Sequence, residues 1–405
     1  MKILHLSANG FTVKNLLIPQ IDYFLDQGFL VEIGCSSGAE TQNLQRQGYI
    51  IRSIEVYRDF HPIFNAIDVL QLARLMRKHR YDLIHVHTPI AAFVGRIAAR
   101  LAGIKRVVYT AHGFPFHDYS PGYLYYLYFM LEKLAAPLTD LILTQSYEDF
   151  LTAQTRHLCP IQKVRHLGNG IDIDRFSRTA LSQQYQAKLR HLLGIPKSAD
   201  MLIGTIGRLT YKKGSSFFIE AIAQLLPKFP NLHAIIIGGE VKGDPSPYQA
   251  QLVKQIHKLG LEKHVTLTGY RDDTPELLGL LDIFTLPTFT HEGLPRSILE
   301  AMGMELPVVT TDVRGCREAV VHGKTGLIIP PRDSNALALA LEKLLADQEL
   351  RKTFGKAGRQ RVETEFDETL VFQKLQGFYQ ELGIVPMQQH LKSFPPKAIH
   401  SQSHK

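Results

Sequence analysis

The sequence predicts an α/β protein made of two doubly wound parallel sheets. Short apolar runs rich in β-branched residues alternate with longer segments of helical periodicity almost throughout the chain, which is the pattern of βαβ units. Runs such as Ile203–Ile206 and Ile235–Ile237 lack an alternation of apolar and polar residues, as expected of strands that helices cover on both faces. At 405 residues the chain exceeds the size at which a single core usually divides, so we expect two domains.

Six strands are expected in each half of the chain, with helices filling most of the intervals. Those of the first half are 3–7, 30–35, 83–87, 106–111, 141–144 and 164–167. Those of the second half are 202–206, 234–237, 265–268, 283–286, 308–310 and 327–329.

An irregular passage at Gly168–Asp172 separates the two halves, and we place the domain boundary there. The first domain is then 1–172 and the second 173–366, followed by a last helix at 367–382. Two open parallel sheets that face each other leave a cleft at the carboxyl ends of their strands, where ligands of such folds bind. The tail, 383–405, is rich in Pro, Gln, Ser, Lys and His, which predicts disorder.

The composition excludes several classes of protein. Apolar residues make up 45% of the chain, and no apolar run approaches the roughly 18 residues that a membrane-spanning helix needs. The first residues, Met1–Ser7, predict a buried strand rather than a signal peptide. Cys35, Cys159 and Cys316 lie too far apart to suggest a disulfide framework or a zinc site, which fits a reducing cytoplasm. The net charge of +8 allows weak attraction to an anionic surface, but it is not gathered into the basic stripe of a nucleic-acid-binding protein.

The stretch Glu292-Gly-Leu-Pro-Arg-Ser-Ile-Leu-Glu300 places two carboxylates on either side of a predicted helix start. Pro295 suits the first helical turn, because its missing N–H would be unpaired there anyway. Glu292 then lies in the loop and Glu300 in the second turn. Free N–H groups at a helix start bind phosphate, and the two carboxylates can accept hydrogen bonds from the hydroxyls of a sugar and a ribose. The simpler alternative is two unrelated surface glutamates.

A second motif, Gly207-Arg-Leu-Thr-Tyr-Lys-Lys-Gly214, closes the first predicted strand of the second half. Its cations Arg208 and Lys213 can hold a diphosphate, and Arg can bind it through two parallel hydrogen bonds. They would also neutralise the charge on a departing nucleoside diphosphate, so no metal ion is strictly required. A basic surface turn is the alternative, but the presence of the Glu292 segment favours a nucleotide-sugar site.

These motifs resemble those of the retaining glycosyltransferases of family 4, which have the GT-B architecture. The resemblance runs from Lys2 to about Leu382 and implies two Rossmann-like domains facing across a cleft, with the last helix crossing back to the first domain. The first-domain segments look like members that build bacterial surface polysaccharides on lipid-linked acceptors. The segments that carry the resemblance are GRLTYKKG, THEGLPRSILEAM, PVVTTDVRGCREAVVHGKTGLIIPPRD, HVHTPIAAFVGRIAARLAG and VYTAHGFPFHD.

The resemblance also implies roles for individual residues. Arg208 and Lys213 would contact the donor diphosphate, and Glu292 would hold the transferred sugar. His112, at the end of a first-domain strand, would lie near the sugar and the acceptor, although a histidine at a strand end is often structural. Together these four residues are the predicted catalytic set.

Four further positions are predicted to bind the donor. Glu300 would hold the ribose hydroxyls, and the N–H groups of Gly293 and Leu294 would meet a phosphate or the sugar. Gly10 would let the backbone approach the diphosphate. Here the chain departs from the family, because its loop Ser-Ala-Asn-Gly10-Phe-Thr-Val has one Gly where many members have two.

Two other features have a structural and a functional interpretation. His85 and His87 lie on a predicted buried strand, where core histidines are common, and no third ligand at a usable spacing suggests a metal site. The aromatic segment Pro121–Leu131 predicts a packed helix, or else a face that contacts a membrane interface. Nearby Lys and Arg residues could then add attraction to anionic lipid.

We therefore expect a retaining hexosyltransferase that moves a sugar from a nucleoside-diphosphate donor, preferably UDP-linked, to a glycan or polyprenyl-linked acceptor in cell-surface polysaccharide biosynthesis. No metal or other cofactor is expected, and the enzyme would work in the cytoplasm, at the inner face of the membrane if the aromatic helix contacts lipid. By resemblance, N-acetylglucosamine is preferred to galactose and glucose, with guanosine-linked mannose as the other choice. The alternatives are an epimerase or phosphorylase of the same fold, and a non-catalytic nucleotide-sugar-binding subunit.

Overall fold

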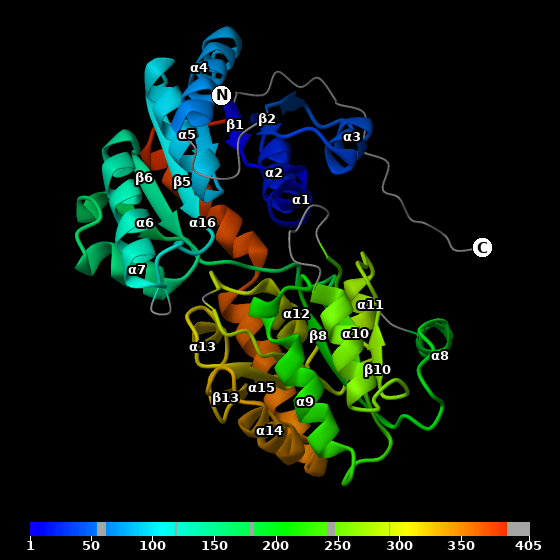
Figure 1. Cartoon of the computed structure of the whole chain (residues 1–405). Coiled ribbons are helices and arrows are strands. Elements are labelled where there is room, and N and C mark those ends of the chain that lie inside the picture. The colour runs from blue at the N-terminus through cyan, green and yellow to red at the C-terminus, as the bar shows by residue number, and fades with distance from the viewer. Residues whose placement is uncertain (55–61, 118–119, 179–181, 241–247, 291, 387–405) are drawn as a thin grey trace. The chain divides into compact units, whose positions relative to one another are not determined.

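The computed structural model describes residues 1–54, 62–117, 120–178, 182–240, 248–290 and 292–386 (Figure 1). The chain divides into two compact units, Met1–Val107 with Gly377–Lys405, and Val108–Gln376. This division falls inside the strand Arg106–Ala111 of the first sheet. The predicted boundary at residue 172 comes, in the sequence, after the last strand of the first sheet and before the first strand of the second, and it stays a prediction. Most of the predicted disordered tail lies outside the described residues.

The first sheet has seven strands in the order β3-β2-β1-β4-β5-β6-β7. β1 pairs in parallel with β2 and β4, and β6 pairs in parallel with β5 and β7. All six predicted strands of the first half are present, and the sequence missed only the short β3. The strands are β1 (Lys2–Leu6), β2 (Leu30–Cys35), β3 (Ile51–Ser53), β4 (Leu83–Val86), β5 (Arg106–Ala111), β6 (Leu141–Thr144) and β7 (Val164–His166).

The helices of the first half connect these strands. A short stretch of π-helix, Val13–Leu17, joins α1 to α2. The predicted aromatic helix is α6, which is longer than the segment that suggested it. The helices are α1 (Gly10–Thr12), α2 (Ile18–Asp26), α3 (Ala39–Arg46), α4 (Pro62–His79), α5 (Pro89–Leu101), α6 (Gly122–Ala135) and α7 (Tyr147–Thr155).

The second sheet has six parallel strands in the order β10-β9-β8-β11-β12-β13, and all six were predicted. In both sheets the first strand lies in the interior, and the order in which the strands are added reverses beside it. This is the doubly wound topology. The strands are β8 (Met201–Ile206), β9 (Leu232–Ile237), β10 (Val265–Leu267), β11 (Ile283–Leu286), β12 (Val308–Thr311) and β13 (Gly326–Ile329).

Helices cover both faces of the second sheet, which explains why its strands are apolar on both sides. Along β9, Ile235 and Ile237 belong to one apolar cluster, and Ala234 and Ile236 belong to another. The first cluster includes α12 and α15, and the second includes α9 and α14, which lie side by side in Figure 1. The helices are α8 (Gln183–Leu192), α9 (Ser215–Leu225), α10 (Tyr248–Lys258), α11 (Thr274–Leu278), α12 (Arg296–Gly303), α13 (Cys316–Ala319), α14 (Ser334–Ala346) and α15 (Gln348–Glu365).

The last helix, α16 (Glu368–Glu381), confirms the predicted return of the chain to the first domain. Its end belongs to the unit that contains Met1–Val107. There the Tyr379 ring packs against Phe24 at a centroid distance of 4.9 Å, and Arg106 donates a hydrogen bond of 2.6 Å to the carbonyl of Leu382. Among the described residues, every helix is too short or too polar to cross a bilayer.

Candidate active site

Lys213 and Glu292, which are 79 positions apart in the sequence, form an ion pair. The Lys213 ammonium donates a hydrogen bond of 2.6 Å to Glu292 Oε1. The hydroxyl of Thr288 lies 3.1 Å from the same carboxylate oxygen and 3.0 Å from the carbonyl of Lys212. Both charged side chains keep about a fifth of their surface exposed, at 21% and 18%, so water reaches the pair.

Gly214, whose backbone is in the left-handed conformation, positions Lys213. The chain leaves β8 and makes one turn of 3-10 helix at Tyr211–Lys213, and Gly214 then starts α9 with a φ of 77°. A Cβ atom at Gly214 would lie only 1.9 Å from the carbonyl oxygen of Pro287. Glycine is therefore required for this turn to pack against the loop that leads to Glu292.

Three loops meet beside Glu292 through their backbones. The Glu292 N–H donates a hydrogen bond of 3.0 Å to the carbonyl of Arg314. A Cβ atom at Gly293 would lie 2.5 Å from the carbonyl oxygen of His112, and one at Gly315 would lie 2.0 Å from the carbonyl oxygen of Gly293. The structure thus brings predicted residues His112, Lys213, Glu292 and Gly293 into one place.

His112 follows the end of β5, as predicted, and it is partly exposed. Removal of water around the ring lowers its pKa to about 4, although a hydrogen bond with Gln145 acts in the opposite direction. The imidazole is therefore neutral at pH 7. A neutral ring has one N–H donor and one nitrogen acceptor, which suits it to bind a sugar hydroxyl.

The loop after His112 is fixed by a buried ion pair that sequence reasoning missed. Asp149 on α7 is fully buried, and its carboxylate accepts hydrogen bonds from Arg314 at 2.7 Å and from the Phe114 N–H at 3.1 Å. Burial raises the pKa of Asp149 to about 6, and Arg314 opposes this rise. Arg314 lies in a motif that carried the family resemblance, but the sequence did not show what it binds.

Glu318 forms a second contact between these segments. Its carboxylate accepts hydrogen bonds from the Tyr147 and Glu148 N–H groups, both at 2.8 Å, and from the Ser146 hydroxyl at 2.5 Å. A carboxylate at this place satisfies unpaired N–H groups at the start of α7 and interacts favourably with the helix dipole. Residues 170 positions apart are thereby held together, which no local sequence signal indicates.

The helix after Glu292 begins one residue later than predicted. Pro295 is the N-cap of α12, with extended angles of φ −71° and ψ 111°, rather than part of the first turn. An N-cap residue keeps a non-helical backbone while its carbonyl accepts the first helical bonds, here from the Ile298 N–H at 3.1 Å. Leu294 is buried, and its carbonyl accepts a hydrogen bond of 2.9 Å from Asn169.

Glu300 lies in the second turn of α12, as predicted. Arg296, one turn earlier, is 3.8 Å from Glu300 Oε1 and also 3.4 Å from Glu368 on α16. Burial raises the pKa of the Glu300 carboxyl, and Arg296 acts against that rise. A partly buried carboxylate 3.8 Å from its nearest guanidinium retains acceptor capacity for ligand hydroxyls.

Arg208 and Gly10 are the two remaining predicted residues. Arg208 follows β8, and its exposed guanidinium forms no ion pair within the part of the chain that the structure describes. Gly10 belongs to the other compact unit, where it starts α1 and is buried. A Cβ atom there would lie 2.7 Å from Thr41 Cγ2, so packing against α3 already requires a glycine.

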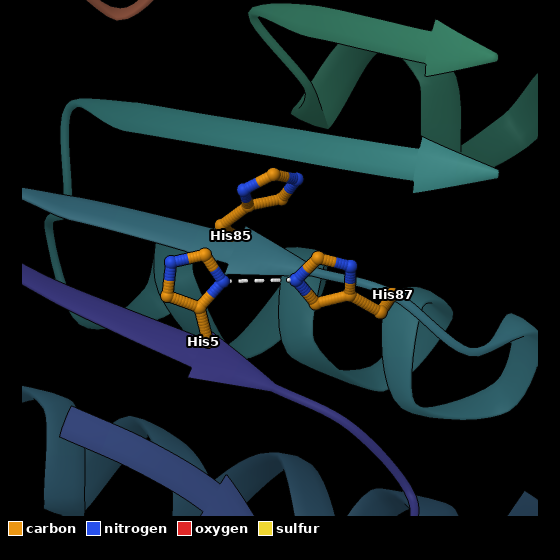
Figure 2. A group of neighbouring side chains, drawn as sticks. All are labelled: His5, His85 and His87. Atoms are coloured by element: carbon orange, nitrogen blue, oxygen red, sulfur yellow. Dashed lines mark hydrogen bonds between the residues drawn. The ribbon is translucent and has the colours of Figure 1, made fainter. Parts of the chain in front are cut away.

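The sequence showed no third ligand at a usable spacing from His85 and His87, but the structure places a third histidine next to them. His5 on β1 lies beside them in the first sheet, and Figure 2 shows the three rings together. His5 and His87 are 82 positions apart in the sequence, so no local motif indicates that they are neighbours. They come together because β1 and β4 pair.

Comparisons with known proteins agree with this architecture. The family model described as Glycosyl transferases group 1 matches residues 194–361, and the model for Glycosyltransferase Family 4 matches residues 20–175. The capsular polysaccharide biosynthesis glycosyltransferase CapM of Staphylococcus aureus is 28% identical, with 93% of this chain and 96% of that protein covered. The UDP-Gal:alpha-D-GlcNAc-diphosphoundecaprenol alpha-1,3-galactosyltransferase of Escherichia coli is 27% identical over 92% of this chain and 94% of its own length.

Solved structures show the same fold. The crystal structure of Anabaena HepE in complex with UDP and glucose superposes with a TM-score of 0.81 at 26% identity. That match covers 94% of this chain and all of the HepE chain.

Proposed function

Because the chain belongs to the family 4 glycosyltransferases with the GT-B fold, we propose that it transfers a hexose from a nucleoside-diphosphate sugar to a hydroxyl of a growing cell-surface polysaccharide. The observation that carries the proposal is the Lys213–Glu292 ion pair before the start of α12. A cation and a carboxylate at one place can bind, respectively, a phosphate and a sugar hydroxyl of the same donor.

The proposed donor is UDP-linked. HepE binds UDP and glucose in its crystal structure, and the Escherichia coli relative is named for UDP-galactose. A Mycobacterium tuberculosis relative named for GDP-mannose is also similar, with 28% identity over 77% of this chain, so the base must be tested directly. N-acetylglucosamine, galactose and glucose are the sugars to compare, with Glu300 as the proposed partner of the ribose hydroxyls.

The proposed reaction retains the configuration of the donor sugar. The bond from its anomeric carbon to the leaving phosphate breaks, and a bond from the same face of that carbon to the acceptor oxygen forms. The acceptor proton passes to the leaving phosphate. Arg208, Lys213 and the N–H groups that precede and start α12, including those of Gly293 and Leu294, would stabilise the charge on the nucleoside diphosphate without a metal ion.

His112 and Glu292 would position the sugar. The neutral imidazole can exchange a hydrogen bond with one hydroxyl, and the Glu292 carboxylate can accept one from another. Because the backbones of His112 and Gly293 are in contact, the two side chains start from fixed positions. Such fixed geometry lowers the entropic cost of reaching the transition state.

The proposed acceptor is a lipid-linked glycan, and α6 is the proposed membrane contact. Five large apolar side chains of this helix are exposed, by between 49% and 74%. The only charged residue on the exposed side of α6 is Lys133. Tyrosines with aliphatic neighbours and a cation suit the interface of an anionic membrane. The exposed residues are Tyr123, Tyr126, Leu127, Met130 and Leu134.

A cavity beside the end of α6 supports the same proposal. It has a volume of about 650 Å³, and its walls include Lys133, Ala136, Pro137, Leu158 and Ile161. Lys133 therefore belongs both to the exposed side of α6 and to the cavity wall. An apolar cavity with a cation can accept part of a lipid together with its anionic group.

The proposal is tested by a transfer assay with purified protein. Binding of UDP, GDP and ADP, and of their sugar conjugates, is first measured by thermal shift, since a ligand that binds only the folded state raises its stability. The donor that binds is then incubated with polyprenyl-diphosphate-linked acceptors, and the anomeric configuration of the product is determined by NMR. Donor epimerised without acceptor, or binding without transfer to any acceptor, would contradict the proposal.

A further inference from the structure

Three histidines from two neighbouring strands lie together on one face of the first sheet. β1 and β4 pair in parallel with His5 directly opposite His85, and His87 follows two positions later. Side chains two positions apart on a strand point to the same face. The His-x-His sequence and the opposite position on the next strand therefore place all three imidazoles together (Figure 2).

The spacing of these rings is close to that of a metal site. One nitrogen from each residue can be chosen so that all three lie within 4.8 Å of one another. His5 Nδ1 and His87 Nε2 are hydrogen-bonded to each other at 3.0 Å (Figure 2), a contact that a bound metal ion would replace. Three nitrogens at 2.0–2.1 Å from a tetrahedral ion would be separated by about 3.3 Å, so small rotations of the side chains are sufficient.

The surroundings keep these histidines ready to bind a metal. His5 and His85 are 0% exposed and His87 is 1% exposed. His5 Nε2 is buried without a hydrogen-bond partner among the described residues, which leaves a polar atom unsatisfied.

Tyr379 can fix the orientation of the His85 ring through a hydrogen bond, as partners of metal-bound histidines commonly do. His85 Nδ1 and the Tyr379 hydroxyl are 2.6 Å apart. If Nδ1 donates this bond, Nε2 is the unprotonated nitrogen of the ring and therefore the one that would face a metal ion.

We propose that His5, His85 and His87 bind one divalent transition-metal ion of the zinc type. Imidazole nitrogens favour Zn²⁺, Cu²⁺ and Ni²⁺ over Mg²⁺ and Ca²⁺, which prefer oxygen ligands. The ion would join β1 to β4 and, through Tyr379, to α16.

The test is metal binding by the full chain without an affinity tag. The protein is treated with a chelator, dialysed, and titrated with Zn²⁺ and with Co²⁺, whose visible absorption reports its ligands. We expect one equivalent of Zn²⁺ that survives gel filtration, a tetrahedral Co²⁺ spectrum and a higher Tm. Binding of less than about a tenth of an equivalent by the folded wild-type protein, or no change in Tm on zinc addition, would overturn the proposal.

Two control variants exclude other histidines. His390, His400 and His404 lie in the tail outside the described residues, and their triple exchange to Gln should leave the stoichiometry unchanged. His233→Gln changes another buried histidine, on β9 of the other unit, and should also bind one equivalent. His85→Gln and His87→Gln should each abolish tight binding while circular dichroism shows a folded chain. Loss of binding in the tail variant would assign the metal to the tail and overturn the proposal.

Discussion

The Lys213–Glu292 pair and the histidine cluster of the first sheet are both groups of titratable side chains, but they differ in their exposure to solvent. The ion pair keeps about a fifth of its surface in water, whereas the three histidines have almost none. In the histidine cluster, burial lowers the pKa of His5 and so favours its neutral form. In the two proposals, the partly exposed group binds an anionic substrate and the buried group binds a metal cation.

The largest expected effect is the loss of sugar transfer when the Lys213–Glu292 pair is broken. Lys213→Ala removes a cation from the proposed diphosphate site, and transfer should fall by about 10²–10³-fold, as for loss of other groups that stabilise transition-state charge. Glu292→Ala should have an effect of similar size. The measurement is kcat/KM for sugar transfer.

Lys212→Ala is the matched control, because this neighbouring lysine is exposed and only its carbonyl contacts Thr288. Its kcat/KM should stay within about threefold of wild type. Equal losses for Lys212→Ala and Lys213→Ala would mean that general positive charge, rather than the ion pair, supports the reaction.

The second prediction concerns His5 and the pH dependence of the free energy of unfolding. The pKa of His5 falls from an ordinary value of 6.5 to about 3 on folding, because of burial. Between these two values the unfolded chain binds more protons than the folded one, so the free energy of unfolding should decrease as the pH is lowered from about 6.5 towards 3. The loss should be on the order of a few kcal/mol.

Urea unfolding at pH 7.5, 6 and 5, in the presence of a chelator, measures this slope. His5→Asn should flatten it, whereas His257→Asn should not, since the His257 side chain is 83% exposed. An unchanged slope in His5→Asn would show that other groups cause the acid sensitivity.

The third prediction tests the close backbone contact between Gly315 and the segment Glu292–Gly293. Gly315→Ala places a Cβ atom 2.0 Å from the carbonyl of Gly293 at a φ of 81°, and should lower the free energy of unfolding by about 2 kcal/mol or more. The control is Gly377→Ala in α16, where a Cβ atom meets nothing within 4 Å. That change should stabilise the chain by about 0.5–1 kcal/mol, and equal destabilisation by both would contradict the packing argument.

The smallest effect is expected at the proposed membrane contact. Leu134→Glu puts an anion on α6, where Leu134 is 66% exposed, and should weaken binding to anionic vesicles several-fold. Leu339→Glu is the matched control, because this leucine of α14 is 68% exposed. Vesicle flotation compares the two variants with wild type, and equal binding by all three would exclude α6 as the contact.

Much of the fold could be predicted because parallel strands between covering helices have a strong local pattern. The exception, Ile51–Ser53, has three residues and pairs with β2 along the edge of the sheet, so its apolar signal is short. The start of α12 was misplaced by one residue because Pro295 fits both the N-cap and the first turn. The motifs at Lys213 and Glu292 were identified, but their direct ion pair was not.

The sequence by itself determined the two sheets, the family resemblance and most residues of the candidate site, since strands, turns and motifs depend on neighbours in the chain. Only the tertiary structure decided that His5 joins His85 and His87, that Glu318 caps α7, and that Asp149 binds Arg314 beside the His112 loop. These contacts join residues 80 to 172 positions apart. They depend on strand register and on how loops pack, and no local propensity encodes either.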